Sequence, residues 1–450
     1  GVTTTGSEEK VDENTLFMMA SNSKAFAGTA LAMLEYEGRC KLDDKVVKWL
    51  PWFSMYDTTL TRMATLTDLL THRMGYKTFQ NDLMVFYSDF SSKDLMKRFP
   101  MLIPPYGFRT TYGYSNLGYV WAGECIKVIS GKPWNTYVEE NLLDPLGMKR
   151  TQTSSASLAA MPNTATGHTF NFGKLTPFPH PNADATGPAA AMSSTANDMA
   201  NWLLMWTGFG EYDGNSIIDG EVYEKVLTPG IFIDRNGHPY NTARYRLYGL
   251  GFSIADYEDV EIISHSGGIW GFVSGVSFVP DLELGITILT NSDENWFYDA
   301  LKYEIIDAYL GLEYRDYSGL FYRFKKVLDT RKENEIGRWQ DSVAMDLKMP
   351  YPLRKFKGVY YNDIYGSITL KKKGKKLVMT MEHHPDITGI LEWMGDDRFL
   401  CTYSPSRMGV KVFPFRILED GSIELSLTVA SRLDKEVWLF ISEPGKVQNR

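Results

Sequence analysis

The sequence predicts a mixed α/β fold class, in which a helical region lies over an antiparallel sheet, followed by a C-terminal all-β barrel. Residues 40–210 carry apolar side chains mainly at helical spacing, with loops rich in Pro, Gly and Asn between the helices. From about residue 245 the chain consists of short β-rich runs bounded by turn residues. From about Lys355 apolar and polar residues alternate between frequent turns, which is typical of a small sandwich or barrel.

Length and composition agree with more than one globular domain. A chain of 450 residues is too long for one compact core, and 44% hydrophobic and 23% charged residues are typical of globular proteins. We expect a first domain over residues 1–312, a charged helical connecting segment over 313–353 and the barrel over 354–450. Acidic residues exceed basic ones, 55 against 47, for a net charge of −8. This balance argues against a nucleic-acid surface, because such surfaces are basic.

The elements are expected in the following order. Residues 1–14 are polar and turn-like, and SNSKAFAGTALAMLEYEG, from Ser21 to Gly38, has the apolar spacing of a helix with a glycine at its end. Further helices are expected in TLTDLLTHRMG, NLGYVWAGECIKVISG, WNTYVEENLLDPLGM and STANDMANWLLMWTG. Consecutive strands are expected in YGLGFSIADY, VEIISHSGG, GFVSGVSFVP and LGITILTNS, followed by a helix in WFYDALKYEIIDAYLG.

Cysteine content and hydropathy say little about the cellular compartment of the protein. Cys40, Cys125 and Cys401 are far apart and odd in number, so they indicate neither a disulfide framework nor metal-ligand spacing. No apolar run is long enough to span a bilayer, and no signal peptide is visible. Because the chain begins with Gly1, an upstream signal could have been removed, so localisation stays open, with the cytoplasm slightly favoured over the periplasm or another compartment.

An S-x-x-K pattern occurs twice, and a chain of this size is expected to contain about one by chance. Ser7–Lys10 lies among polar residues, whereas Ser21–Lys24 opens an amphipathic helix on which residues three apart share a face. A lysine whose pKa is lowered by partial burial could accept the serine proton. The alternative is a helix-capping serine followed by an exposed lysine.

Two later stretches carry further candidate residues. In YGYSNLGYVWAGE, Tyr114 beside a lysine ammonium could shuttle protons, and Asn116 could donate an amide hydrogen bond to a substrate carbonyl. The alternative there is a turn over a packed aromatic ring. In IISHSGGIWGF, the glycines after His265 and Ser266 would let a ligand lie along the strand edge. The alternative there is a bulge with a hydrogen-bonded histidine.

The order of these three motifs resembles that of the serine β-lactamase and penicillin-binding-protein-like superfamily, most closely its class C and esterase-like branch, peptidase family S12. In that branch the second motif is Y-x-N and the third is often H-x-G instead of K-T-G. LTDLLTHRMG, NLLDPLGMKRT and GPAAAMSSTANDMANW resemble further segments of the family, so the resemblance covers residues 10–310. It implies the β-lactamase/transpeptidase-like fold. The all-β tail resembles the lipocalin-like C-terminal domain attached to many such proteins.

The resemblance implies a role for each candidate residue. Ser21 would be the acylated nucleophile, Lys24 its proton acceptor and Tyr114 the general base and acid that also serves the leaving group. His265 would orient Tyr114 or a substrate carboxylate, in place of the lysine of true β-lactamases.

The same resemblance implies the substrate-binding set. Asn116 would bind the acyl side of the substrate, and Ser266, Gly267 and Gly268 would lie along it. The backbone N–H groups of Ser21 and Gly268 would form an oxyanion hole.

Two features depart from the family pattern. A strand hairpin usually precedes the serine helix, but only twenty residues precede Ser21 here, so we expect either fewer strands in the central sheet or an absent upstream segment. The usual glycine pair of P-A-G-G-L is Ala190-Ala191 in this chain, which would narrow the nearby backbone.

Three functions remain open at this point: a serine hydrolase of small amides, peptides or esters, an acyltransferase with the same acyl-enzyme, and a non-catalytic binding protein. A β-lactam-hydrolysing enzyme is less favoured because of His265. We expect no cofactor and no metal, since no H-E-x-x-H occurs, and the adjacent His383 and His384 would point to opposite faces of a strand. No G-x-S-x-G elbow of an α/β-hydrolase occurs either, and His72 is expected to be structural. The expected partner is a small-molecule or peptide substrate, with homo-oligomerisation left open and neither a nucleic acid nor a membrane span expected.

Overall fold

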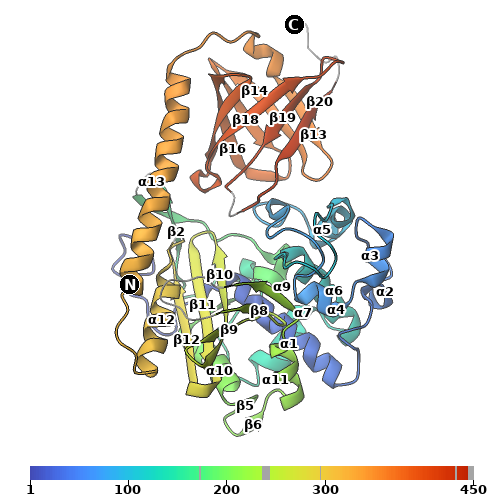
Figure 1. Cartoon of the computed structure of the whole chain (residues 1–450), viewed down its shortest axis with the longest axis vertical. Helices are drawn as coiled ribbons and strands as arrows, with labels where there is room; N and C mark the ends of the chain where they lie inside the picture. The colour runs from blue at the N-terminus through green and yellow to red at the C-terminus, as the bar shows by residue number, and fades with distance from the viewer. Residues whose placement is uncertain (172–173, 236–243, 294, 431–432, 444–450) are drawn as a thin grey trace. The chain divides into compact units, whose positions relative to one another are not determined.

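The computed structural model describes residues 1–171, 174–235, 244–293, 295–430 and 433–443 (Figure 1). The described chain divides into two compact units. The first consists of Gly1–Thr78 and Ser92–Phe321, and the second of Phe79–Ser91 together with the chain from Tyr322 onward. In the part of the chain that is described, no helix combines the length and the apolar character needed to cross a membrane.

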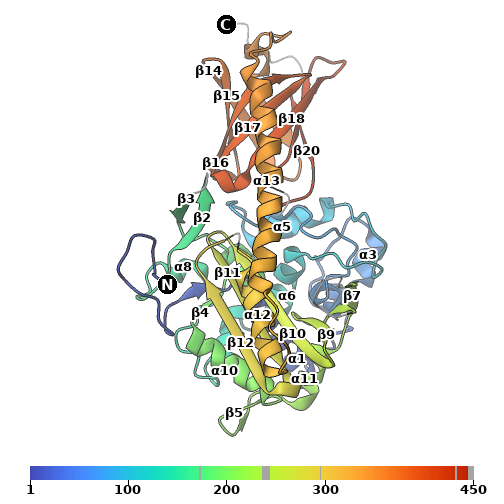
Figure 2. The ribbon, with the colours of Figure 1, turned by 60° about the vertical axis from the view of Figure 1, so that its left-hand side comes forward.

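The first unit is built on an antiparallel sheet in which neighbours in sequence are neighbours in space (Figures 1 and 2). Glu258 and Asp259 join two of its strands with φ of 46° and 67°, as a two-residue hairpin turn requires. In sheet order the strands are β12 (Leu284–Thr290), β11 (Phe272–Val279), β10 (Val260–Ile269), β9 (Ser253–Tyr257), β8 (Arg246–Tyr248) and β7 (Ile231–Asp234).

Helices cover both faces of this sheet. On one face α12 (Phe297–Tyr309) and the first turn of α13 (Tyr317–Ala344) pack on strand residues such as Ile262 and Val279. On the other face lies α10 (Ala196–Thr207), whose Trp206 stacks on Phe278 with ring centroids 5.4 Å apart. The unit therefore has a helix–sheet–helix arrangement around two apolar layers.

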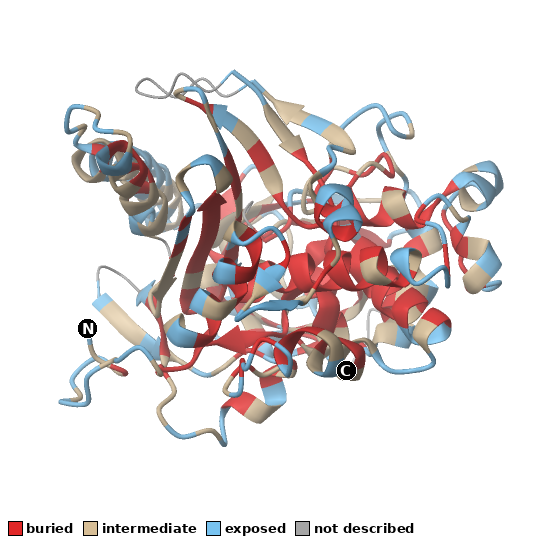
Figure 3. Ribbon diagram, turned by 90° about the horizontal axis from the view of Figure 1, so that it is seen from below, coloured by how far each residue is buried: buried red, intermediate tan, exposed pale blue. Residues whose placement is uncertain are grey.

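Helix α1 (Ser23–Tyr36) is one of the buried helices of the first unit, and Figure 3 shows buried residues gathered in the middle of the view. All of its residues from Ser23 to Ala32 are buried, and apart from Lys24 they are apolar or small around the whole circumference of the helix. At Gly28 a side chain would overlap the carbonyl group of Leu250. This close packing holds α1 in place, and its first turn carries Lys24 directly after the turn that contains Ser21.

Shorter elements complete the first unit. Its other helices are α2 (Val46–Trp49), α3 (Thr58–Met63), α4 (Leu66–Leu70), α5 (Ser92–Arg98), α6 (Asn116–Ser130), α7 (Trp134–Val138), α8 (Ser155–Leu158), α9 (Gly187–Ala190) and α11 (Gly220–Leu227). Its short strand pairs are β1 (Phe17–Met18) with β4 (Ser193–Ser194), β2 (Gly167–Asn171) with β3 (Lys174–Phe178), and β5 (Glu211–Tyr212) with β6 (Asn215–Ser216).

The second unit is a closed antiparallel barrel (Figure 1). Its interior is filled by side chains such as Phe399, Phe413 and Phe415, so the barrel has a packed core. The strands are β13 (Gly358–Asn362), β14 (Gly366–Lys373), β15 (Lys376–Met381), β16 (His384–Gly395), β17 (Arg398–Ser404), β18 (Val410–Ile417), β19 (Ile423–Leu427) and β20 (Trp438–Ser442).

The expected fold class is confirmed, including the helix in 296–311 and the barrel. The structure also contains elements that were not expected, namely strand β7 and the β2–β3 hairpin. Ahead of Ser21 only the short β1 is present among the strands, and it pairs with β4 outside the six-stranded sheet. The units divide after Phe321 and not after residue 312, and Phe79–Ser91 joins the barrel unit.

Candidate active site

Ser21 lies in a tight turn just before α1. The 3-10 turn Ala20–Asn22 precedes the first residue of the helix, and Ala20 has φ of 48°, in the left-handed region that few alanines adopt. Ser21 is partly exposed, whereas Ala20 and Asn22 are buried. A strained backbone of this kind persists only where the surroundings hold it, and it presents the Ser21 hydroxyl at the surface of the fold.

Lys24 is completely buried beside Ser21. Its Nζ lies 3.2 Å from Ser21 Oγ, 2.6 Å from Asn116 Oδ1 and 2.9 Å from the carbonyl oxygen of Ala189. The same nitrogen lies 4.7 Å from the centre of the Tyr114 ring. The alternative of a capping serine with an exposed lysine is therefore wrong, because the lysine is enclosed by polar atoms from three other segments.

The loop that carries Tyr114 is held by backbone donors. The N–H of Tyr114 donates to Thr78 Oγ1 at 3.2 Å, and the N–H of Ser115 donates to His72 Nδ1 at 3.1 Å. His72 is buried, has φ of 58°, and accepts the N–H of Gly113 at its own carbonyl oxygen. Burial, with the nearby charge of Lys24, holds the pKa of His72 well below its usual range. A neutral His72 thus fixes the start of the second motif.

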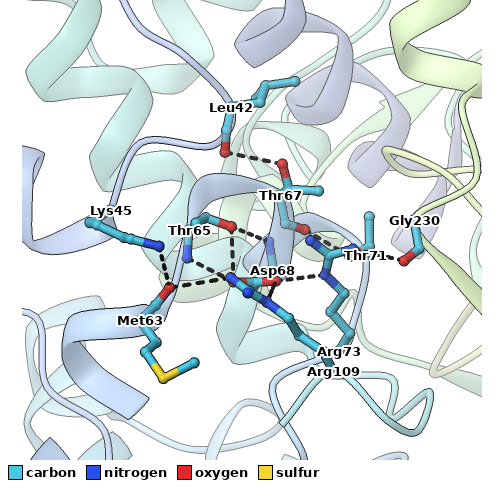
Figure 4. A network of polar contacts seen from close by, with 10 residues as sticks. All are labelled: Leu42, Lys45, Met63, Thr65, Thr67, Asp68, Thr71, Arg73, Arg109 and Gly230. Atoms are coloured by element: carbon cyan, nitrogen blue, oxygen red, sulfur yellow. Dashed lines mark hydrogen bonds and ion pairs between the residues drawn. The ribbon is translucent and has the colours of Figure 1, made fainter. Parts of the chain in front are cut away.

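Asp68 organises the neighbouring loops (Figure 4). Its carboxylate accepts from Arg73 Nε at 2.6 Å and from Arg109 Nη2 at 2.7 Å, and it forms a capping box with Thr65 at the start of α4. Burial opposes ionisation, but the two guanidinium groups outweigh it and hold the pKa of Asp68 below its usual value. Arg73 also donates to the carbonyl oxygen of Gly230 at 2.8 Å, so this network joins α4 to the segments that carry Arg109 and Gly230.

Strand β10 extends beyond β9 and passes the serine turn. β9 pairs only with residues 260–264, so the stretch from His265 onward has no partner on that side among the described strands. Gly267 lies directly against the turn, since a side chain there would overlap the Met19 carbonyl oxygen. Ser274 Oγ donates to that oxygen at 2.9 Å and accepts from Asn22 Nδ2 at 2.8 Å, which joins β11 to the turn.

His265 is buried, and its ring nitrogens face groups other than Tyr114. Nδ1 lies 2.7 Å from the carbonyl oxygen of Ser266, which can only accept, so Nδ1 carries the proton. Nε2 then accepts from the hydroxyl of Tyr248 at 2.9 Å. Burial first, and the charge of Lys24 second, lower the pKa of His265 to about 3, so the ring is neutral at physiological pH.

The structure brings Ser21, Lys24, Tyr114 and Asn116 together, with His265 6.1 Å from Tyr114 between ring centroids. The other expected residues differ in placement. Gly268 has open space beside it, whereas the side chain of Ser266 lies on the opposite face of the strand from His265, toward Tyr298 of α12. Any contact of Ser266 with a substrate would therefore involve its backbone.

Some site residues carried no sequence signal. Tyr248 and the Asn22–Ser274 pair belong to no motif, and Ala189 lies in the segment GPAAAM, whose pattern did not indicate a contact with Lys24; the packing of α9, β8 and β11 brings them to the site. No group of three or more His, Cys, Asp or Glu residues suited to a metal occurs within the described ranges.

Comparison with known proteins identifies related chains. Residues 1–310 match the family model described as Beta-lactamase. The chain is 25% identical over 411 residues to an unguisins hydrolase of Aspergillus violaceofuscus, an alignment that covers 82% of this chain and 70% of that protein.

Solved structures share the fold. The octameric penicillin-binding protein homologue from Pyrococcus abyssi superposes on this chain with a TM-score of 0.59 at 20% sequence identity. The superposition covers 98% of this chain and 92% of the homologue's chain. The D-amino acid amidase from Ochrobactrum anthropi SV3 superposes with a TM-score of 0.56 at 22% identity and covers 69% of this chain and 87% of its own. The first likeness includes both units, and the second covers a length close to that of the first unit.

Proposed function

The chain belongs to the beta-lactamase family and is a serine hydrolase of that fold, and we propose that it cleaves small amide, peptide or ester substrates through an acyl-enzyme at Ser21. The observation that carries this proposal is the buried Lys24, whose Nζ lies 3.2 Å from Ser21 Oγ. A lysine enclosed in this way and in contact with a hydroxyl fits the pairing of a nucleophile with its base.

The hydrogen-bond partners of Lys24 support a role in proton transfer. As an ammonium group, Nζ donates its three protons to Asn116, Ala189 and Ser21. After loss of one proton, two N–H bonds remain for the two carbonyl oxygens, and the lone pair is directed at the hydroxyl of Ser21. The same three neighbours therefore suit both protonation states, so little rearrangement accompanies the transfer.

The proposed reaction has two halves. Ser21 Oγ attacks the substrate carbonyl carbon and its proton passes to Lys24, while the N–H groups of Ser21 and Gly268 would stabilise the oxyanion. Tyr114 would then deliver a proton to the leaving nitrogen or oxygen as its bond to carbon breaks, and the proton held by Lys24 would pass to Tyr114 in its place. In the second half a water molecule attacks the acyl-enzyme, releases the carboxylic acid and restores the Ser21 hydroxyl. Asn116, whose Oδ1 accepts a hydrogen bond from Lys24, would align the acyl side of the substrate.

The state of His265 supports the substrate class. Both ring nitrogens are occupied by Ser266 and Tyr248, and a pKa near 3 leaves the ring uncharged. A neutral ring cannot form an ion pair with a substrate carboxylate. We therefore propose substrates whose binding does not depend on a carboxylate group beside His265. This argues for an amidase, peptidase or esterase over a β-lactamase, in line with the hydrolase and amidase names of the relatives.

The proposal is tested by mass spectrometry of the intact protein after reaction with a fluorophosphonate probe, followed by peptide mapping. We expect one adduct, on Ser21, that Ser21→Ala removes. Ser7→Ala is the matched control, because Ser7 belongs to the other S-x-x-K pattern but Lys10 is exposed, and it should label like the wild type. An adduct confined to another serine, or no adduct on the folded protein, contradicts the mechanism. D- and L-amino acid amides, short esters and β-lactams then serve as the first substrates.

The assembly state is a separate proposal. The Pyrococcus abyssi homologue is octameric, and its fold covers nearly all of this chain. We propose that this chain also forms a homo-oligomer. Light scattering after size-exclusion chromatography checks this, and a mass of about 51 kDa at all concentrations contradicts it.

A further inference from the structure

The segment Phe79–Ser91, here named the capping segment, lies between residues of the first unit in sequence but packs within the barrel unit. Its backbone is unusual, because Phe79, Asn81 and Tyr87 have φ of 61°, 58° and 60°. Left-handed conformations cost free energy for residues with a side chain, especially for aromatic ones, and persist only where surrounding contacts hold them.

A buried polar network supplies one set of these contacts. Asn81 Nδ2 donates to the hydroxyl oxygen of Tyr365 at 2.9 Å, and that hydroxyl donates to Asp434 Oδ2 at 2.8 Å. The N–H of Leu83 reaches the same carboxylate oxygen at 3.4 Å. Asn81, Tyr365 and Asp434 are each at most 5% exposed. Buried networks of this kind hold their members strongly, since each unmade bond leaves a desolvated polar group.

Two histidines form a second set of contacts. His384 Nε2 lies 3.0 Å from the carbonyl oxygen of Leu83, and His383 Nδ1 lies 2.8 Å from Asp89 Oδ1. The N–H of Asp89 donates to the His383 carbonyl oxygen at 3.0 Å, and the ring of Phe90 lies 4.3 Å from that of His383. The capping segment is therefore attached to the barrel at both of its ends.

All these contacts are made at one end of the barrel. Successive hairpins of an antiparallel barrel turn at alternate ends, so the connections β13–β14, β15–β16 and β19–β20 share one end. Tyr365 lies in the first of these connections, His383 in the second and Asp434 in the third. The capping segment closes this end, whereas Phe356, which precedes β13, packs at the other.

The capping segment continues directly into the loop that holds Tyr114. Thr78, one residue before the segment, accepts the N–H of Tyr114, and Asn81 follows only three residues later. Just before Tyr114, Gly113 has no room for a side chain because the carbonyl oxygen of Tyr76 fills that space. Only two residues, Phe79 and Gln80, thus separate a residue held by the barrel from a hydrogen bond to the Tyr114 backbone.

We propose that Tyr365 and Asp434 of the barrel are positioning residues for the reaction, because they hold Asn81 and thereby fix Thr78 against the backbone of Tyr114. This inference rests on the proposed function, in which Tyr114 transfers protons. The barrel then contributes to catalysis through the chain that it anchors. The strained φ angles of Phe79 and Asn81 agree with this role, since the segment would relax if the anchor were lost.

The test compares two Tyr→Phe variants of the full-length protein. Tyr365→Phe removes the hydroxyl that joins Asn81 to Asp434. Tyr360→Phe is the matched control, because Tyr360 is equally buried in the same barrel but its hydroxyl donates to the carbonyl oxygen of Phe356 at 2.9 Å, at the opposite end. Both variants delete one oxygen from the barrel interior; Tyr365→Phe breaks two hydrogen bonds and Tyr360→Phe one, so any difference in the amount of folded protein is read separately from the labelling rate.

The measured quantities are the rate constant and the amplitude of fluorophosphonate labelling. In Tyr365→Phe we expect a rate constant reduced about 10-fold with full amplitude, since a small misplacement of a reacting group costs up to about 100-fold. Tyr360→Phe should keep the wild-type rate constant. For a turned-over substrate, kcat should fall more than KM changes.

The outcomes separate the two proposals. A wild-type rate constant in Tyr365→Phe overturns the positioning role, and so does a reduced amplitude with an unchanged rate constant, which indicates partial unfolding only. Equal losses in both Tyr→Phe variants also overturn it. Absence of any Ser21 adduct in the wild type contradicts the proposed function itself.

Discussion

Replacing Asp68 by Ala should strongly destabilise the first unit. The carboxylate is fully buried and accepts hydrogen bonds from Arg73, Arg109 and both donors of Thr65 (Figure 4). Breaking a buried ion pair costs about 3–5 kcal/mol, and loss of the capping box adds about 1 kcal/mol. The side chains of Arg73 and Arg109 are 19% and 37% exposed, so water can partly rehydrate them. We therefore expect a loss of about 3 kcal/mol in the free energy of unfolding.

Two buried cysteines allow this loss to be assigned to one unit. Cys125 lies in α6 of the first unit and Cys401 in β17 of the barrel, and both are buried and free. Thiol labelling across a urea series, read by peptide mass spectrometry, reports the unfolding of each unit. With a urea dependence of about 3 kcal/mol per molar, the Cys125 midpoint should fall by about 1 M, whereas the Cys401 midpoint should change less.

Glu124→Ala on α6 is the control. Glu124 pairs with Lys127 at 3.2 Å, but that lysine is 54% exposed, and such pairs contribute less than about 1 kcal/mol. A Cys125 midpoint in Asp68→Ala that matches the control would refute the reasoning.

The pH dependence of the free energy of unfolding provides a further check on Asp68. The pKa of Asp68 lies below its usual value of about 3.9, so its contribution is complete above that pH and is lost as pH falls through the folded-state pKa. The difference between wild type and variant should therefore shrink below about pH 4.

Three further predictions follow from the site. Gly267→Ala should lower the Cys125 midpoint because its methyl group meets the Met19 carbonyl oxygen, whereas Gly268→Ala, with open space, should not; equal midpoints contradict this. His265, with a pKa near 3, should show no NMR titration between pH 5 and 8. The free energy of unfolding of the first unit should fall as pH drops from about 6.5 toward 3, because in this range the imidazole of His265 gains a proton only in the unfolded chain. Lys24→Met should slow fluorophosphonate labelling by at least about 100-fold in folded protein, and wild-type labelling would remove the lysine from the mechanism.

Local patterns predicted the elements that local interactions determine. The helical spacing after Ser21 placed Lys24 on the same face, and the structure has their side chains 3.2 Å apart. The hairpins from 246 to 290 follow from short turns between β-rich runs. The helix itself begins at Ser23 and not at Ser21, because the serine is in a 3-10 turn held by tertiary contacts.

Contacts between distant segments could not be predicted in this way. The burial of Lys24 depends on the carbonyl group of Ala189, which is 165 residues away, and the hydrogen bonds of His265 depend on which tyrosine the sheet places beside it. The capping segment shows the same limit. Its left-handed residues are Phe, Asn and Tyr with no glycine among them, so nothing in the local sequence indicates its conformation, which is determined by the barrel.

The capping segment is synthesised long before the barrel residues that hold it, and this order affects how the protein folds on the ribosome. Asn81 and Tyr365 are 284 residues apart, and Leu83 and Asp434 are 351 residues apart, so the anchor residues leave the ribosome long after the loop that they hold. Contacts of such sequence separation form late, because a long loop must close first. The nascent first unit can therefore acquire its helices and sheet while the loop of Tyr114 still lacks its anchor. If the two proposals hold, completion of the C-terminal barrel would be the step that gives the loop of Tyr114 its anchor, and a chain truncated before the barrel would lack that anchor.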